Sequence, residues 1–260
     1  MNAITYYIAS IKNETIKLKR TFAIWLAVIS AMFIPLIFFL YYILKYETLI
    51  PKEGINPWGR FIQDQIFAAG PLIPLFTVLI TSLIIQLEHK SSAIKHLFAM
   101  PVPKWSVYFG KLSIVIGMII FTYTIFFILI LLNGVIQGAI HGELNFLAFS
   151  PDYTKFLKLL FRSCIAILGI VGIQYWLSFR IKNFIIPLGI GMVLVMTGMI
   201  IYRAEESLYF PYAYNMLSLF PIDKDIETLL WFPTVSFYSL GFFTLFSILG
   251  YLDIKRMNIK

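Results

Sequence analysis

Six long stretches of this sequence consist mainly of apolar residues and contain no Asp, Glu, Lys or Arg. They are residues 21–44, 65–87, 112–140, 163–179, 183–202 and 228–252. A helix needs about 20 such residues to cross the roughly 30 Å hydrocarbon layer of a bilayer, so each stretch predicts a membrane span. These spans are expected to be helices, because an isolated strand would leave its N–H and C=O groups unpaired in lipid.

The predicted fold class is an all-α polytopic membrane protein, with six transmembrane helices in one transmembrane domain of residues 1–260. Composition agrees, because 60% of the residues are apolar and only 13% are charged, which is more apolar surface than one water-soluble core could hide. The segments between the spans are too short to form a soluble catalytic domain. Pro35, Pro71 and Pro74 lie within or beside the first two spans and favour kinks there.

The distribution of charge predicts the orientation. If the N-terminus is cytoplasmic, the inner segments carry 13 of the 21 basic residues but only three of the 13 acids. The positive-inside rule therefore favours a cytoplasmic location for both termini. The net charge of +8 then reflects basic residues that face anionic lipid headgroups, so we expect membrane lipids as partners and no nucleic acid.

Two segments outside the spans have a pattern of their own. In residues 1–20, an apolar side formed by Ile4, Tyr7, Ile8 and Ile11 predicts an amphipathic helix that lies in the inner interface, although a solvated helix would have the same pattern. Residues 207–222 are aromatic and apolar, but two prolines interrupt them and they are too short to span. They fit either an aromatic belt or short re-entrant helices.

The sequence lacks the motifs of an enzyme or an ion pump. The six stretches hold no ionisable acid or base apart from Cys164, which argues against a proton-coupled carrier, whereas a Na⁺ site made of carbonyls and hydroxyls stays possible. His89, His96 and His141 form no zinc-binding pattern, and the chain has no P-loop. We expect no catalytic residue, metal or cofactor on this chain.

Three basic residues mark the start of the fourth span. Lys155, Lys158 and Arg162 have the spacing that places cations on one side of a helix. They are candidates for contact with an anionic substrate or with lipid headgroups, and snorkelling to the headgroups is the simpler interpretation.

Residues 91–100, between the second and third spans, predict a short helix. Ser91 or Ser92 can cap its start, and Pro101 and Pro103 stop it. Its apolar positions are Ile94, Leu97 and Phe98. Ten helical residues measure only about 15 Å, so the helix cannot cross the membrane and is expected to lie along the inner surface, as a docking element or a capped loop.

This region resembles the inner loop of ABC-2 type ABC-transporter permeases. The resemblance is carried by Glu88 at the end of the second span, the short helix, Pro101-Val102-Pro103-Lys104 and Gly110-Lys111. The sequence departs from the family pattern at Ser92-Ala93, where the family has a Gly-Thr-like pair, and at Pro103, where it has Ser. The number of spans and the inner termini extend the resemblance over the whole chain.

The resemblance implies a half-size membrane subunit in the cytoplasmic (inner) membrane of a bacterium, paired with a second copy or a similar permease. Two separate ATPase subunits would bind ATP and Mg and drive it, and the short helix would be the coupling helix. The residues implied in coupling are Glu88, Lys90, Ser91, Ser92, Lys95, Leu97, Phe98, Pro101 and Lys104. The expected activity is export of an amphipathic antimicrobial peptide, drug or lipid-like molecule.

Two other functions are compatible with the same spans. An ion-coupled secondary carrier would transport without an ATPase. A membrane anchor for an ATPase or enzyme would not transport at all.

Overall fold

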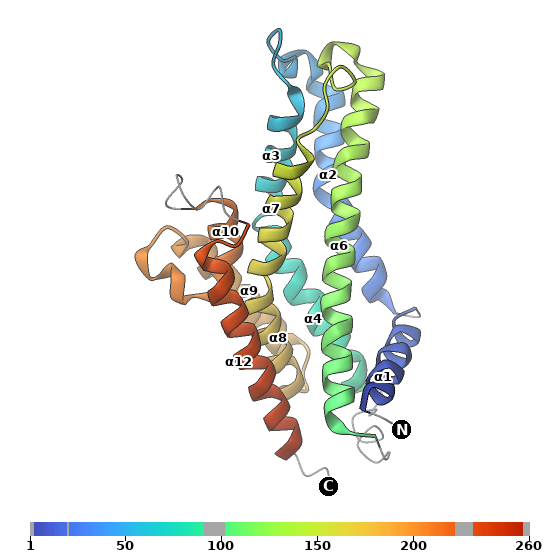
Figure 1. Ribbon diagram of the computed structural model, residues 1–260, viewed down its shortest axis with the longest axis vertical. Coiled ribbons are helices and arrows are strands. Elements are labelled where there is room, and N and C mark those ends of the chain that lie inside the picture. The colour runs from blue at the N-terminus through green and yellow to red at the C-terminus, as the bar shows by residue number, and fades with distance from the viewer. Residues whose placement is uncertain (1–2, 20, 91–101, 222–230, 257–260) are drawn as a thin grey trace.

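A computed structural model describes residues 3–19, 21–90, 102–221 and 231–256, and in this part of the chain the secondary structure is helical. The main helices are α1 (Ala3–Leu18), α2 (Phe22–Leu49), α3 (Pro57–Ala69), α4 (Leu72–Lys90), α6 (Lys104–Ile140), α7 (Tyr153–Ala166), α8 (Leu168–Arg180), α9 (Ile185–Ile201), α10 (Tyr214–Leu219) and α12 (Thr234–Arg256). Figure 1 shows that α2 and α6 run along the long axis of the molecule. The predicted all-α class is confirmed.

Four helical stretches of the described residues are long and apolar enough to cross a membrane: α2, α6, the α7 and α8 pair, and α12. A fifth is formed by α3 and α4 if these two helices, which meet at 48°, count as one broken span. Helix α9 is apolar but has only 17 residues. The structure thus supports a multi-pass membrane protein, while the sixth span remains a prediction.

Amide side chains attach α6 to α2. Asn133 donates a hydrogen bond to the carbonyl of Pro35 at 2.9 Å, and one turn later Gln137 donates to the carbonyl of Phe39 at 2.9 Å. Both donors are buried, and in lipid such bonds connect helices that the hydrophobic effect alone would not hold together. The two helices consequently stay side by side along the molecule (Figure 1).

The second predicted span is broken. Residues 65–87 fall on the end of α3 and on α4, and the two helices meet at Gly70 and Pro71. The break has a direct cause, since Pro71 and Pro74 have no backbone N–H to continue the helical hydrogen bonds. The expected kink is therefore present, and it divides the span.

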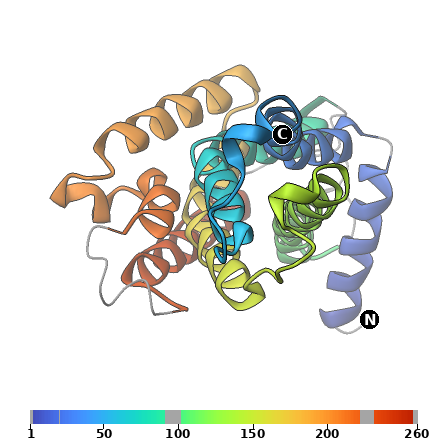
Figure 2. The ribbon, with the colours of Figure 1, turned by 90° about the horizontal axis from the view of Figure 1, so that it is seen from above.

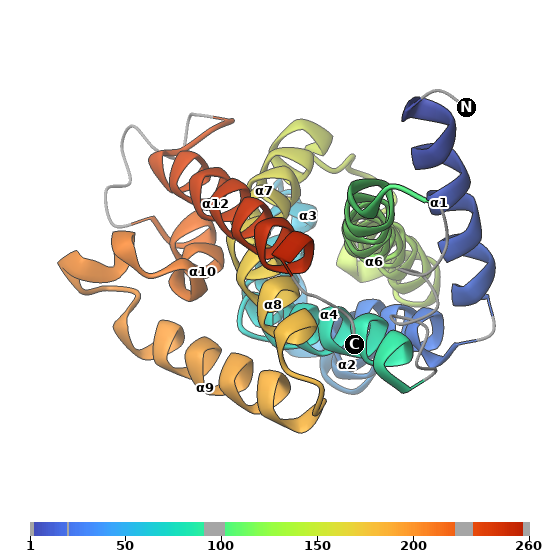
Figure 3. The same ribbon diagram turned by 90° about the horizontal axis from the view of Figure 1, so that it is seen from below.

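The periphery of the bundle holds α1 and α9. Viewed from above and from below, α9 runs along one edge of the molecule and α1 along the opposite edge, beside α6 (Figures 2 and 3). The start of α1 and the end of α12 lie toward the same end of the molecule (Figure 1). Of the aromatic segment 207–222, Tyr212 and Tyr214 are buried, while Tyr209 is 71% exposed.

Candidate functional site

The predicted coupling region connects α4 to α6. Glu88 and Lys90 belong to the last turn of α4, and Lys104 is the first residue of α6. The coupling helix itself, at residues 91–100, lies outside the described residues. The same is true of six of the proposed coupling residues: Ser91, Ser92, Lys95, Leu97, Phe98 and Pro101. The structure therefore defines the two helices that this segment joins.

Both ends of the segment contact another helix. At the end of α4, the His89 ring nitrogen Nε2 donates a hydrogen bond to the carbonyl of Ser178 in α8 at 2.9 Å. At the start of α6, the Trp105 ring stacks on the Tyr7 ring of α1, while the Ser106 hydroxyl and backbone N–H donate to the carbonyl of Pro103 within the first turn, at 2.8 and 3.0 Å. The segment thus connects two helix ends that have fixed neighbours.

A buried cluster of charges, which we call the charged junction, attaches α1 to α6. Glu14 of α1 forms ion pairs with Lys111 of α6 and with Lys17, whose Nζ lies 2.8 Å from Glu14 Oε1. Glu14 is only 4% exposed and Lys111 only 2%. The charged junction lies seven residues, about two helical turns, after the start of α6.

Uncharged contacts extend the charged junction along α1. The Tyr7 hydroxyl is hydrogen-bonded to Ser113 Oγ at 2.5 Å, and the Tyr7 ring stacks on Trp105 with 6.2 Å between the centroids. Ile4 and Ile8 are instead exposed, at 71% and 59%. The amphipathic α1 therefore packs Tyr7 and Glu14 against α6, and it leaves an isoleucine face uncovered.

Lys111 belongs to the family pattern in the sequence, whereas no sequence pattern predicts a role for Glu14. One signal was present, because Glu14 is the only acid in the first 46 residues. It also lies one heptad after Tyr7, which is the spacing that places two residues on the same side of a helix.

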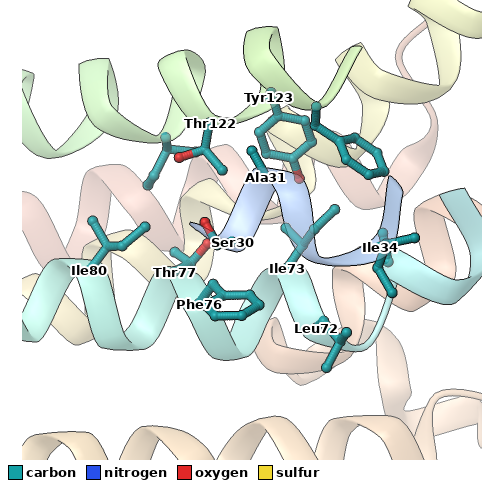
Figure 4. Close-up of a pocket in the computed structure, with 13 residues that line it drawn as sticks. Ser30, Ala31, Ile34, Leu72, Ile73, Phe76, Thr77, Ile80, Thr122 and Tyr123 are labelled. Carbon is teal, nitrogen blue, oxygen red and sulfur yellow. The ribbon is translucent and has the colours of Figure 1, made fainter. Parts of the chain in front are cut away.

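A small cavity of about 30 Å³, which is partly open to the outside, lies between α2, α4 and α6. Figure 4 shows side chains of all three helices that line it. The lining residues are Ser30, Ala31, Ile34, Ala69, Leu72, Ile73, Phe76, Thr77, Ile80, Ile119, Thr122, Tyr123 and Phe126. The walls are thus mostly aliphatic and aromatic.

The few hydroxyls in the cavity do not make it strongly polar. Ser30 Oγ donates to the carbonyl of Ala27 at 2.8 Å, and Thr122 Oγ1 donates to the carbonyl of Met118 at 2.9 Å. These two hydroxyl protons are bonded to the backbone of their own helices. The cavity therefore suits a hydrocarbon group with few polar atoms.

One end of the cavity meets a chain of uncharged hydrogen bonds, which we call the neutral junction. Ser163 donates to Asn215 Oδ1 at 2.6 Å, so its hydroxyl proton is already engaged and Tyr123 donates to Ser163 at 2.7 Å. The Asn215 amide donates to the carbonyl of Gly70 at 2.6 Å. That carbonyl lacks its usual helical donor because the residue four positions later is Pro74. The neutral junction thus links α6, α7 and α10 to the break between α3 and α4.

The three basic residues of α7 have different surroundings. Asp152 caps the helix by accepting a hydrogen bond from the backbone N–H of Lys155 at 3.0 Å. Lys155 is exposed and Lys158 is half-buried, whereas Arg162 is only 2% exposed. The structure therefore separates Arg162 from the two lysines, although they were predicted as one group.

Comparison with known proteins gives one finding. The chain matches the family model of the ABC-2 family transporter protein over residues 10–198. No curated protein sequence matches it. The matched region contains α2, α4, α6 and most of α1, and membership implies association with an ABC ATPase partner. Since the match covers well over half of the 260 residues, the chain belongs to the ABC-2 transporter family.

Proposed function

We propose that this protein is the permease subunit of an ATP-driven exporter, and that an ATPase on another chain acts on the segment between Lys90 and Lys104. The observation that carries the proposal is topological. This segment joins α4 to α6, and these two helices form two of the three walls of the cavity. A displacement of the segment would change the distance between those walls.

The length of α6 supports this role. Its 37 residues form one helix of about 55 Å, at about 1.5 Å a residue. A force on its first turn would act along the cavity and reach the far end of the molecule (Figure 1). The proposed contacts with the ATPase, or the supports of those contacts, are Glu88, Lys90, Ser91, Ser92, Lys95, Leu97, Phe98, Pro101 and Lys104.

The proposed complex contains two ATPase subunits, which bind ATP and Mg, and a second copy of this chain or a similar permease. It would reside in the cytoplasmic membrane of a bacterium, with both termini on the cytoplasmic side. Two observations are consistent with this topology: the excess of basic residues in the segments assigned to that side, and the common end at which α1 begins and α12 ends (Figure 1).

The proposed substrate is amphipathic: a peptide, drug or lipid-like molecule with an apolar part that the cavity can receive. The apolar walls favour such a group over an ion or a sugar. Lys155 and Lys158 are candidates for contact with an anionic substrate or a headgroup, because both lie in the first turns of α7 and are at least partly accessible.

Reconstitution of the chain with its ATPase tests the proposal. The two proteins would be co-expressed, purified and placed in lipid vesicles, and export of a fluorescent cationic amphipathic peptide and a fluorescent phospholipid would be measured. We expect transport of at least one probe that needs ATP hydrolysis. Transport by the chain alone along an ion gradient would support a secondary carrier, and a stable complex without transport of a wider panel of amphipathic probes would support an anchor.

A matched pair of variants tests the cavity. Ala31 is 1% exposed and lines the cavity, whereas Ala139 is exposed near the end of α6. We expect Ala31→Leu to lower the transport of the probe and Ala139→Leu to leave it unchanged. Equal transport by both variants would exclude the cavity from the substrate path.

A further inference from the structure

Burial of the Glu14–Lys111 ion pair between α1 and α6 has a large cost in desolvation free energy. Removal of two charges from water costs free energy that their mutual attraction offsets only in part, and apolar residues of similar size often stabilise a protein equally well. Both side chains are almost completely buried, so this cost applies here. Stability alone therefore does not explain why charges hold the two helices together.

The position of the pair indicates what else it does. Lys111 lies two turns into α6, the helix that follows the proposed ATPase-coupling segment in the sequence, and Glu14 lies one turn before the end of α1. Helix α1 leads through a short connection to α2 at Phe22, and α2 is the third wall of the cavity. The pair thus lies on a route from the start of α6 to a helix that the coupling segment does not join directly.

We propose that the Glu14–Lys111 pair makes α1 move as one body with the start of α6, so that a displacement of the coupling segment reaches the first turns of α2, which precede the bonds of Asn133 and Gln137 to this helix, as well as α4 and α6. Glu14 and Lys111 are positioning residues in this role, because they act through the helices and not on the substrate. The inference rests on the proposed function.

Close contacts around the pair favour movement of the two helices as one body. A Cβ atom on Gly110 would lie 2.5 Å from Ser10 Oγ and 3.0 Å from Ser10 Cβ, so the helices meet here without room for a side chain on α6. The hydrogen bond between Tyr7 and Ser113 and the Tyr7–Trp105 stack lie on the same side of α1. An ion pair adds an attraction that falls only with the inverse of the distance between the charges, so it still opposes separation of the helices after shorter-range contacts are lost.

The first experiment separates a role in movement from a role in stability. The variant Glu14→Leu/Lys111→Met replaces the pair with apolar side chains and is expected to stay folded. In the complete complex with its ATPase, we expect its transport of the amphipathic peptide probe per ATP hydrolysed to fall about 2- to 30-fold. The control is Arg60→Gln/Asp64→Asn, which removes an exposed ion pair of α3 and should leave this ratio unchanged.

The second experiment measures the movement itself and needs no substrate. Cys164 is replaced by Ser, and spin labels are attached at Lys12→Cys on α1 and Gly117→Cys on α6, where the added side chain has open space. Labelled copies are diluted among unlabelled ones. We expect the distance between the labels to stay constant when the complex is trapped with ATP and vanadate. In the Glu14→Leu/Lys111→Met variant, we expect it to change.

A disulfide provides the rescue. Ser10→Cys and Gly110→Cys place two Cβ atoms slightly closer than the roughly 3.5–4.5 Å of a disulfide, so a small shift permits the bond. In the Glu14→Leu/Lys111→Met background, oxidation is expected to restore the transport ratio, and reduction to abolish it again.

The outcomes are distinct. If the wild-type complex shows no ATP-driven transport, the proposed function fails. If the wild type transports but the α1–α6 distance changes on trapping, or the apolar double variant couples normally, the inference fails while the proposed function stands. A folded, uncoupled variant that the disulfide rescues supports the inference.

Discussion

The charged and neutral junctions perform similar tasks by different means. Each attaches α6 to other helices, and each has a glycine where an added side chain would be crowded: a Cβ atom on Gly110 would lie 2.5 Å from Ser10 Oγ, and one on Gly70 would lie 3.0 Å from Leu219 Cδ1. The charged junction uses an ion pair two turns after the start of α6. The neutral junction uses hydroxyl and amide groups at the break between α3 and α4.

The two junctions differ in whether a backbone group needs a hydrogen-bond partner. Pro74 leaves the carbonyl of Gly70 without its usual helical donor, and one amide from Asn215 fills that need at modest cost. No such backbone need is evident where α1 meets α6, and there the chain buries two charges instead. We infer that the neutral junction stabilises a bent helix, while the charged junction sets which helices move together. The two should therefore respond differently to substitution.

The largest effect is expected from a single change in the charged junction. Glu14→Leu removes the carboxylate that Lys111 contacts and should lower the free energy of unfolding by about 3–5 kcal/mol. Adding Lys111→Met should recover most of this loss, because the remaining charge is then removed as well. Reversible unfolding in mixed detergent micelles measures both values, and an unaltered stability of the single variant would contradict the role given to the pair.

The neutral junction should show a smaller loss with a different rescue. Asn215→Leu leaves the buried carbonyl of Gly70 without its donor, which should cost about 1–3 kcal/mol, whereas the Ser163 hydroxyl can donate to Tyr123 instead. Pro74→Ala supplies a backbone N–H four residues after Gly70 and should recover part of the loss. The same unfolding assay applies, and the absence of any recovery would show that Asn215 does not compensate for the proline.

A glycine substitution tests how closely α1 meets α6. Gly110→Ala would force Ser10 aside and should cost about 1–3 kcal/mol. Gly117→Ala, in the same helix but facing open space, should instead stabilise the protein by up to about 1 kcal/mol. Equal stability of the two variants in the unfolding assay would contradict the close contact between Gly110 of α6 and Ser10 of α1.

The smallest effect is expected at the edge of the neutral junction. Tyr123→Phe removes one hydroxyl, while Ser163 keeps its bond to Asn215, so the loss should be about 0.5–1.5 kcal/mol. Tyr153→Phe, at an exposed tyrosine, is the control and should change nothing. A loss as large as that of Asn215→Leu would mean that the hydrogen bonds of the neutral junction are strongly cooperative.

The apolar stretches 21–44, 112–140 and 228–252 overlap α2, α6 and α12, because a lipid-facing helix is recognisable from its own composition, although α6 begins at Lys104, eight residues before the predicted third span. The charge-free stretches do not include the first residues of α7, which precede the fourth predicted span. Helix α7 is amphipathic, with Phe156 and Leu160 buried and Lys155 exposed. A search for charge-free stretches cannot detect such a helix.

The two junctions could not be predicted from the sequence, for a different reason. Glu14 and Lys111 are 97 residues apart, and Gly70 and Asn215 are 145 apart, so only the packing of helices brings them together. The prolines did predict a kink and hence a carbonyl without its helical donor, but not which side chain would bond to it. The cavity was likewise not predictable, because three separate helices form its walls.

The central claim is that an ATPase drives this permease through the segment between α4 and α6. Its most direct test is the number of peptide probe molecules exported per ATP hydrolysed by the reconstituted complex. Lys95→Glu, Leu97→Asp and Lys104→Glu alter the segment or its end, and Lys52→Glu reverses an exposed charge between α2 and α3. We predict that the ratio falls about 2- to 30-fold in the first three variants and not in the fourth. A ratio that is unchanged in all three segment variants would contradict the account.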